Sequence, residues 1–370
     1  MTSRNPPVQA PTNQPSSIPQ APPYAPQVSA WKTGFIASPG YDLLFFILSP
    51  LIGLTMILSL DTTSAGWAMQ NETLFGTEAP LLRFFIGTWT FAHLFAVVFR
   101  SHGNPKIFRL FWPRFVIVPI VLLLIFSSAQ WARGIGAAIV VLWDVYHTSM
   151  QNFGFCRIYD SKQGNPPEKG RWLDIWMNHL VYIGPIFVGL SFRTHLKQVH
   201  KTRPFGLDMS ETFQNLLSAQ NAITTGIVII GTIFVAYYIY AHWRMSQDGY
   251  RVSPQKIVLL ISTAVGSIWA WAFLPPLHAY FTANFFHGLQ YFAIVWWIER
   301  GTITKTLRLP QIAWGYAAAL ACFVMVTASA GVWYGVAGKA STLAISITLV
   351  ISLMHFWYDG FIWSVRKHQV

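Results

Sequence analysis

Long apolar stretches alternate with short polar segments along most of the chain. A helix needs about 20 mostly apolar residues to cross a bilayer. Stretches of this kind run over residues 42–60, 81–99, 114–130, 135–153, 173–192, 222–243, 255–274, 278–297, 312–334 and 341–363. Because only helices and closed barrels satisfy their backbone hydrogen bonds inside lipid, the pattern predicts an all-α, polytopic transmembrane helix bundle of about ten spans. We expect residues 39–366 to form this transmembrane helical domain.

The first 38 residues follow a different pattern. They are rich in Pro, Gln and Ser and contain no continuous apolar run. Such a composition cannot bury a core and is typical of disordered segments. It also lacks the apolar core of a signal peptide. We therefore expect residues 1–38 to form a disordered, Pro-rich cytoplasmic tail.

Composition and charge agree with a membrane protein. The chain is 53% hydrophobic and only 10% charged, whereas soluble domains are about a quarter charged. The net charge of +12 does not indicate a nucleic-acid partner, because the basic residues are scattered through short loops. If both termini are cytoplasmic, most of the 25 Lys and Arg lie on the cytoplasmic side, as the positive-inside rule requires. We expect a multi-pass protein of the bacterial inner (cytoplasmic) membrane.

Histidines interrupt the apolar stretches at one shared depth. Five of them fall in the cytoplasmic half of the predicted bilayer, and a sixth follows in the adjoining loop. These six are His93, His147, His179, His287, His355 and, in the loop, His102. An ionisable group inside a bilayer is costly and marks a functional site by default. Because imidazole is a good ligand for iron, zinc and copper, we predict that the six bind a metal, with mono- or dinuclear non-haem iron as the expected cofactor.

Other polar residues share helix faces with these histidines. The pairs, three or four residues apart, are Asp144–His147, His147–Gln151, His287–Gln290 and His355–Asp359. Side chains at this spacing point to one side of a helix, as in the Glu-x-x-His motif of di-metal bundles. We predict that four residues act as catalytic groups, either as ligands or as hydrogen-bond partners of ligands. They are Asp144, Gln151, Gln290 and Asp359.

Several stretches resemble a pattern that recurs in histidine-rich polytopic bacterial membrane proteins of unassigned function. They are "FRSHGNPKIFRLFWPRF", "WDVYHTSMQNFGFCRIYD", "HGLQYFAIVWWIER" and "HFWYDGFIW". In addition, "FTANFFHGLQYFAIVW" at 281–296 resembles one helix of the Brp/Blh family of β-carotene 15,15'-dioxygenases, which are membrane iron enzymes with histidine ligands. This resemblance implies that His287 binds iron. The sequence departs from the family at Tyr291, where the HxxxH motif has its second histidine, and it lacks the early Pro-His-Gly motif.

Three functions remain open from the sequence. The first is a metal-dependent oxygenase, hydroxylase or desaturase that acts on a membrane lipid or isoprenoid, with electrons from a cytoplasmic donor. The second is a proton- or ion-coupled transporter, because intramembrane His and Asp chains carry protons in pumps. The third is an electron-transfer protein in which two histidines hold a haem. The number of histidines and their shared depth favour the first.

Overall fold

The computed structural model describes residues 34–63, 71–74, 77–189, 194, 210–310, 313–338 and 340–363. This part of the chain is helical, apart from loops and a hairpin of two antiparallel strands, β1 (Asn71–Leu74) and β2 (Thr77–Pro80). The all-α class predicted from the sequence is therefore confirmed. Most of the predicted tail, residues 1–33, lies outside the described residues.

The helices follow the predicted apolar stretches. They are α2 (Pro39–Asp42), the π-helix η1 (Leu43–Ile47), α3 (Ser49–Thr63), α4 (Leu81–Ser101), α5 (Pro105–Ser128), α6 (Gln130–Lys162), α7 (Arg171–Val188), α9 (Ser210–Gln247), α10 (Pro254–Phe273), α11 (Pro276–Thr306), α12 (Gly315–Ala337) and α13 (Thr342–Ile362). Each predicted stretch overlaps at least one of them, and the stretch 42–60 covers η1 and most of α3.

Six described helices are long and apolar enough to cross a membrane, namely α4, α5, the part of α9 from residue 214, α10, α12 and α13. A seventh candidate is the pair Pro39–Ile47 and Ser49–Leu60, which is bent by 59°. The helices α6, α7 and α11 are absent from this set, and they carry most of the polar residues singled out above. The six helices and the bent pair have the length and composition expected of a multi-pass membrane protein.

Local sequence explains where several helices begin. The side chains of Asn104, Ser253 and Ser341 accept hydrogen bonds from the first-turn amides of α5, α10 and α13, which is the usual role of an N-cap. Proline follows two of these caps directly, where its missing N–H costs nothing. The Pro275–Pro276 pair separates α10 from α11. The caps and the proline pair set where these helices begin.

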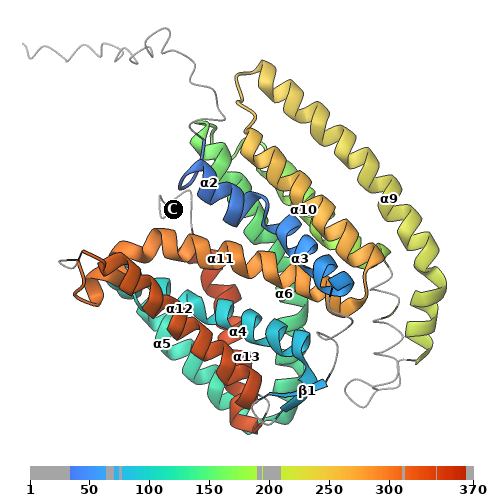
Figure 1. Cartoon of the computed structure of the whole chain (residues 1–370). Coiled ribbons are helices and arrows are strands. Elements are labelled where there is room, and N and C mark those ends of the chain that lie inside the picture. Colours follow the sequence, from blue (N-terminus) through green and yellow to red (C-terminus); the bar gives the residue numbers. More distant parts are fainter. Residues whose placement is uncertain are drawn as a thin grey trace, which may run out of the picture.

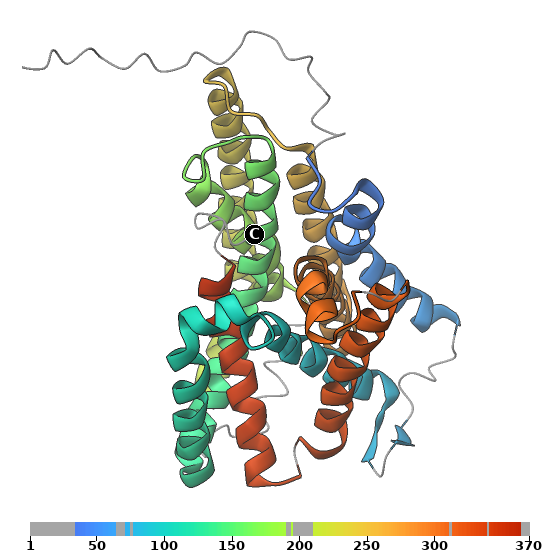
Figure 2. The same ribbon diagram turned by 90° about the vertical axis from the view of Figure 1, so that its left-hand side faces the viewer.

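Two helices form the centre of the bundle. The helices α4 and α11 pack against each other across the middle of the molecule, α12 packs along α4, and α9 lies along the outer edge (Figure 1). After a 90° turn, α5, α12 and α13 extend toward one end, and the loop between α6 and α7 lies toward the other (Figure 2). Large apolar side chains such as Leu124 on α5 and Ile230 on α9 are exposed. Exposed apolar surface on this scale suits contact with lipid.

Candidate metal centre

Four of the six predicted metal ligands meet at one place. They come from four helices: His93 from α4, His147 from α6, His287 from α11 and His355 from α13. Neighbouring ring centroids form a closed cycle with separations of 4.8, 5.2, 4.9 and 5.1 Å, in the order 93–287–147–355–93. All four rings are buried. The packing of four distant segments thus creates a compact cluster of imidazoles, which we call the histidine cluster.

The hydrogen bonds of the cluster leave several ring nitrogens available. His355 Nδ1 lies 3.0 Å from the carbonyl oxygen of Leu94 and donates to it, so His355 Nε2 keeps its lone pair and lies 3.2 Å from His147 Nε2. Neither ring nitrogen of His93 or His287 has a hydrogen-bond partner among the described residues. The Thr90 carbonyl is near the His93 ring but does not meet hydrogen-bond geometry. A buried polar group without a partner costs about 1–3 kcal/mol of folding free energy. These ring nitrogens are therefore available to bind a ligand.

Asp359 completes the cluster. Its Oδ2 lies 3.7 Å from His147 Nε2 and 3.6 Å from His355 Nε2. The other oxygen, Oδ1, accepts hydrogen bonds from Tyr291 Oη at 2.9 Å and from Trp363 Nε1 at 2.8 Å. One oxygen is therefore held by α11 and the end of α13, while the other faces the histidines. Such bonds fix a carboxylate in the orientation that a metal ligand needs.

The arrangement fits a metal ion. Ligand atoms of His93, His287 and His355 lie within 4.8 Å of one another, and so do those of His147, His355 and Asp359. His355 belongs to both groups, so the two triads adjoin, although the five residues together do not meet the same spacing. With metal–imidazole bonds of about 2.0–2.1 Å, two ligands of a tetrahedral ion lie about 3.3 Å apart. The 3.2 Å between His147 Nε2 and His355 Nε2 agrees with that spacing.

Two of the predicted catalytic residues are placed beside the cluster rather than in it. The Gln151 side chain donates to Gln290 Oε1 at 3.1 Å and to the His287 carbonyl at 3.0 Å. Gln290 donates in turn to the Phe46 carbonyl in η1 at 2.9 Å. These amides join α6, α11 and η1. Their bonds hold the backbone that carries His287.

Three further predicted site residues lie away from the cluster. His102 is exposed and contacts Ser101 Oγ at 2.8 Å. His179 is half-buried and contacts Ser149 Oγ at 2.8 Å. The Asp144 carboxylate interacts electrostatically with tyrosines of α7 and α11. Shared depth did not separate His179 from the others, because depth says nothing about which way a side chain points around its helix. His102 was predicted in a loop, and Asp144 was selected by its spacing to His147.

The residues that hold Asp359 were not predicted as site residues. Tyr291 lies four positions after His287, and Trp363 lies four positions after Asp359. The spacing that paired the other residues therefore also marks these two. Trp363 is held in turn, because the Arg100 guanidinium lies 4.1 Å from its ring centroid. Arg100 forms a buried ion pair of 2.7 Å with Glu299.

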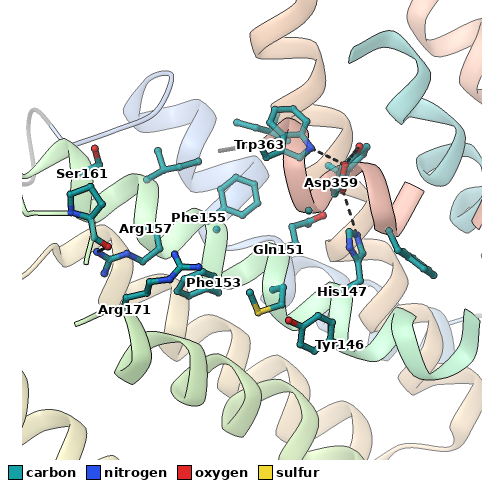
Figure 3. A pocket seen from close by; sticks show the side chains of 18 of the residues that line it. Tyr146, His147, Gln151, Phe153, Phe155, Arg157, Ser161, Arg171, Asp359 and Trp363 are labelled. Atoms are coloured by element: carbon teal, nitrogen blue, oxygen red, sulfur yellow. Dashed lines mark hydrogen bonds and ion pairs between the residues drawn. The ribbon is translucent and has the colours of Figure 1, made fainter. Parts of the chain in front are cut away.

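A cavity of about 540 Å³ adjoins the cluster. Tyr291 is among its lining residues, and Figure 3 shows His147 and Asp359 at one end and Arg157 and Arg171 at the other. Figure 3 shows the two ends separated by aromatic side chains, with His147 and Asp359 facing each other. The volume falls within the range of about 300–1,000 Å³ typical of small-molecule sites. The cavity thus places apolar space directly beside the candidate ligands.

A buried network of charges lies beyond the arginine end. Lys256 Nζ contacts Asp160 at 2.9 Å and Asp174 at 3.0 Å. Arg157 contacts the same two carboxylates at 2.8 and 2.7 Å. The sequence interpretation treated Arg157 and Lys256 as loop residues that set topology. The structure corrects this, because both side chains are buried between α6, α7 and α10 and neutralise two carboxylates.

Comparison of the chain with protein families, with curated proteins and with solved structures finds no match.

Proposed function

We propose that the protein is a membrane-embedded, non-haem metal oxidoreductase whose metal is iron. The observation that carries the proposal is the histidine cluster itself. Four buried imidazoles and one oriented carboxylate converge from four helices, and two of the rings have no hydrogen-bond partner among the described residues. Imidazole and carboxylate together are typical ligands of iron in oxygenases, and also suit zinc, copper or manganese.

The position of the cavity supports a lipid or isoprenoid substrate. Its wall is largely apolar and includes Met150, Phe155, Ile294 and Phe356. A bound iron supplies one-electron and O₂ chemistry, which the side chains of the chain lack. The protein's own part is to exclude water and to hold a substrate against Asp359 and His147. The Tyr291 hydroxyl donates to Asp359 Oδ1, and that bond directs Oδ2 toward the histidines.

The proposal includes a membrane arrangement. We propose about ten spans with both termini in the cytoplasm of a bacterium, in the inner membrane. In this arrangement α6, α7 and α11 cross the bilayer although their polar residues lower their hydropathy. The cluster then lies in the cytoplasmic half, where a cytoplasmic electron donor can reach it.

The geometry favours a non-haem ion over a haem. Two axial histidines on opposite sides of a haem iron lie about 4 Å apart, twice a metal–nitrogen bond of about 2 Å. The Nε2 atoms of His147 and His355 are closer, at 3.2 Å, and two more imidazoles flank them. A transporter that relays protons through the same histidines remains the main alternative, and the metal analysis below separates the two.

Metal analysis and an ultraviolet–visible spectrum of the purified protein test the proposal. We expect one or two equivalents of iron and no Soret band, since two adjoining triads of candidate ligands share His355. His287→Ala and His355→Ala should lose the metal. His102→Ala and His179→Ala are matched controls, because both remove an imidazole outside the cluster, and they should keep it. A folded wild-type protein without metal would contradict the proposal and favour the proton relay, and a Soret band would favour the haem.

A further inference from the structure

Two segments that are far apart in the sequence bring cations to one side of the molecule. They are the first turns of α5 and the end of α11 with the turn that follows it. The segments are tied together, because the Asn104 side chain, which caps α5, donates to both carboxylate oxygens of Glu299 on α11, at 3.2 and 2.9 Å. Figure 2 shows the start of α5 and the end of α11 on the side that faces the viewer. The cations, which we call the basic surface, are Lys106, Arg109, Arg114, Lys305 and Arg308.

The charge of the basic surface is not neutralised within the described part of the chain. All its side chains are exposed, and none forms an ion pair with a described residue. Glu299 is the only acidic residue in the stretches 98–118 and 296–310. It is buried, and it already pairs with Arg100 at 2.7 Å. The basic surface therefore presents positive charge to whatever lies outside the protein.

Apolar surface suited to lipid begins directly beside these cations. The helix α5 is long and apolar enough to cross a membrane, and Leu110 and Trp112, which lie among its cations, are exposed. It is kinked at Phe111, so its first turns run at an angle to the span that follows. The helix α12 is another candidate span, and the exposed Trp314 directly precedes it. Tryptophan together with Lys and Arg is typical of the level of the lipid head groups.

Arg308 occupies a backbone position that normally belongs to glycine. In the described part of the chain it is the one residue other than glycine with a positive φ, at 57°. Its amide donates to the Lys305 carbonyl and the Leu309 amide donates to the Thr304 carbonyl, both at 3.0 Å, which is the Schellman arrangement that often ends a helix at glycine. A residue with a Cβ is strained in this conformation. Because glycine would be more stable here, the arginine indicates a use for its side chain other than folding stability.

From these features we infer that the basic surface is a binding site for an anionic phospholipid. Its phosphate would meet Arg308 and the cations of α5, and its acyl chains would lie against the exposed apolar side chains of the same helix, such as Ile120 and Leu124. Guanidinium groups bind phosphate through paired hydrogen bonds, and clusters of Lys and Arg beside a span attract anionic lipid. An acidic soluble protein would also be attracted by the charge, but the exposed Leu110 and Trp112 among the cations favour lipid. The inference depends on neither the metal nor the oxidoreductase.

Equilibrium binding of short-chain lipids to the full-length protein in dodecyl maltoside, an uncharged detergent, tests this inference. The probes are dioctanoyl phosphatidylglycerol and dioctanoyl phosphatidylcholine, which share the acyl chains and the phosphate but differ in net charge. Phosphatidylglycerol should bind at least about fivefold more tightly, which is the effect of one cation near anionic head groups. The preference should shrink as salt is added, because the surface charges are screened. Equal affinities for the two lipids would overturn the inference and leave the basic surface to an acidic soluble partner.

Neutral variants at the start of α5 show whether the preference comes from this surface. The double variant Lys106→Gln, Arg109→Gln should bind phosphatidylglycerol at least about fivefold more weakly and phosphatidylcholine as tightly as the wild type. Arg244→Gln is the matched control, because Arg244 is an exposed cation that follows the exposed Trp243 near the end of α9, outside the basic surface. It should keep the preference. An equal loss in the control and the double variant would contradict a site at the basic surface.

Arg308→Gly separates lipid binding from folding. Glycine relieves the left-handed backbone, so the unfolding temperature should stay the same or rise. The affinity for phosphatidylglycerol should nevertheless fall about fivefold, because one cation is lost. Unchanged affinity in this variant would exclude Arg308 from the lipid site. A lower unfolding temperature would show that the arginine side chain supports the fold instead, and would refute the argument from its backbone.

Discussion

His147 Nε2 and His355 Nε2 lie 3.2 Å apart, although 208 residues separate them in the chain. Two buried nitrogens at this distance either share one proton or bind one ion. The nearby carboxylate oxygen of Asp359, 3.6 and 3.7 Å from these two atoms, makes a third donor for an ion. The pair therefore couples the fold to metal binding, since the same ligands hold α6 and α13 together.

Removal of the metal should lower the thermal stability of the protein. A ligand that binds only the folded state stabilises it by about 4 kcal/mol at a thousand times its dissociation constant. We expect a chelator to lower the unfolding temperature of the wild-type protein in detergent and added Fe²⁺ to restore it. His355→Ala should unfold at a lower temperature and respond to neither reagent. A chelator response in this variant equal to that of the wild type would show that the metal lies elsewhere.

Loss of the Tyr291 hydroxyl should weaken metal binding without removing a ligand. Tyr291→Phe deletes the 2.9 Å hydrogen bond that orients Asp359, and losses of this kind cost about 10–100-fold in metal affinity. Titration of the metal-free protein with Fe²⁺ measures the effect. Tyr358→Phe is the control, because this buried tyrosine of α13 directs its hydroxyl toward the Arg114 carbonyl. Equal Fe²⁺ affinities in the two variants would show that Tyr291 does not orient a metal ligand.

The sequence predicted the existence of the helices well, because the length of an apolar stretch is a local signal. Each predicted stretch overlaps a helix, but α5 begins at Pro105 rather than at 114, and the stretch 42–60 crosses a bend of 59°. Depth in the membrane was the signal that selected the histidines. It correctly grouped residues from four helices, since residues at one depth of a bundle can meet.

The sequence failed where rotation around a helix decides the outcome. Gln151 and Gln290 lie on the predicted faces, but they bind each other and backbone carbonyls rather than the imidazole rings. Asp144 lies one turn before His147 on α6 but belongs to no group of candidate metal ligands among the described residues. The hydrophobic pattern of a membrane helix constrains rotation weakly, because lipid-facing and core-facing positions are both apolar. The sequence did not indicate that Lys256 is buried, because its partners Asp160 and Asp174 come from other helices and no local pattern pairs them.

Replacement of Lys256 should destabilise the protein strongly. Lys256→Met leaves Asp160 and Asp174 with one buried cation between them, and breaking a buried pair in this way costs about 3–5 kcal/mol. The double variant Lys256→Met, Asp160→Asn restores the charge balance and should recover part of that loss. Lys162→Met, an exposed lysine, should change stability by less than about 0.5 kcal/mol. Unfolding in detergent measures all three, and a Lys256→Met protein as stable as the wild type would show that the network is not a structural element.

Close packing of α4 and α12 should link Gly331 to the metal site. A Cβ added at Gly331 meets the Thr88 carbonyl oxygen of α4 and lies 3.0 Å from Ala92 Cβ. Ala92 precedes His93, so Gly331→Ala should displace the segment that carries a candidate ligand. Overpacking of this kind costs about 1–3 kcal/mol, and we expect a lower unfolding temperature together with weaker iron binding.

Gly226 on α9 supplies the control for this prediction. Nothing lies within 4 Å of a Cβ added there, and alanine is favoured over glycine inside a helix by about 0.5–1 kcal/mol. Gly226→Ala should therefore keep or raise stability and leave iron binding unchanged. If Gly331→Ala lowered stability but bound iron as tightly as the wild type, the packing of α4 against α12 would be independent of His93. Weaker binding in Gly331→Ala alone would show that small residues at this helix contact hold the ligand in place, as they do at other close helix pairs in membranes.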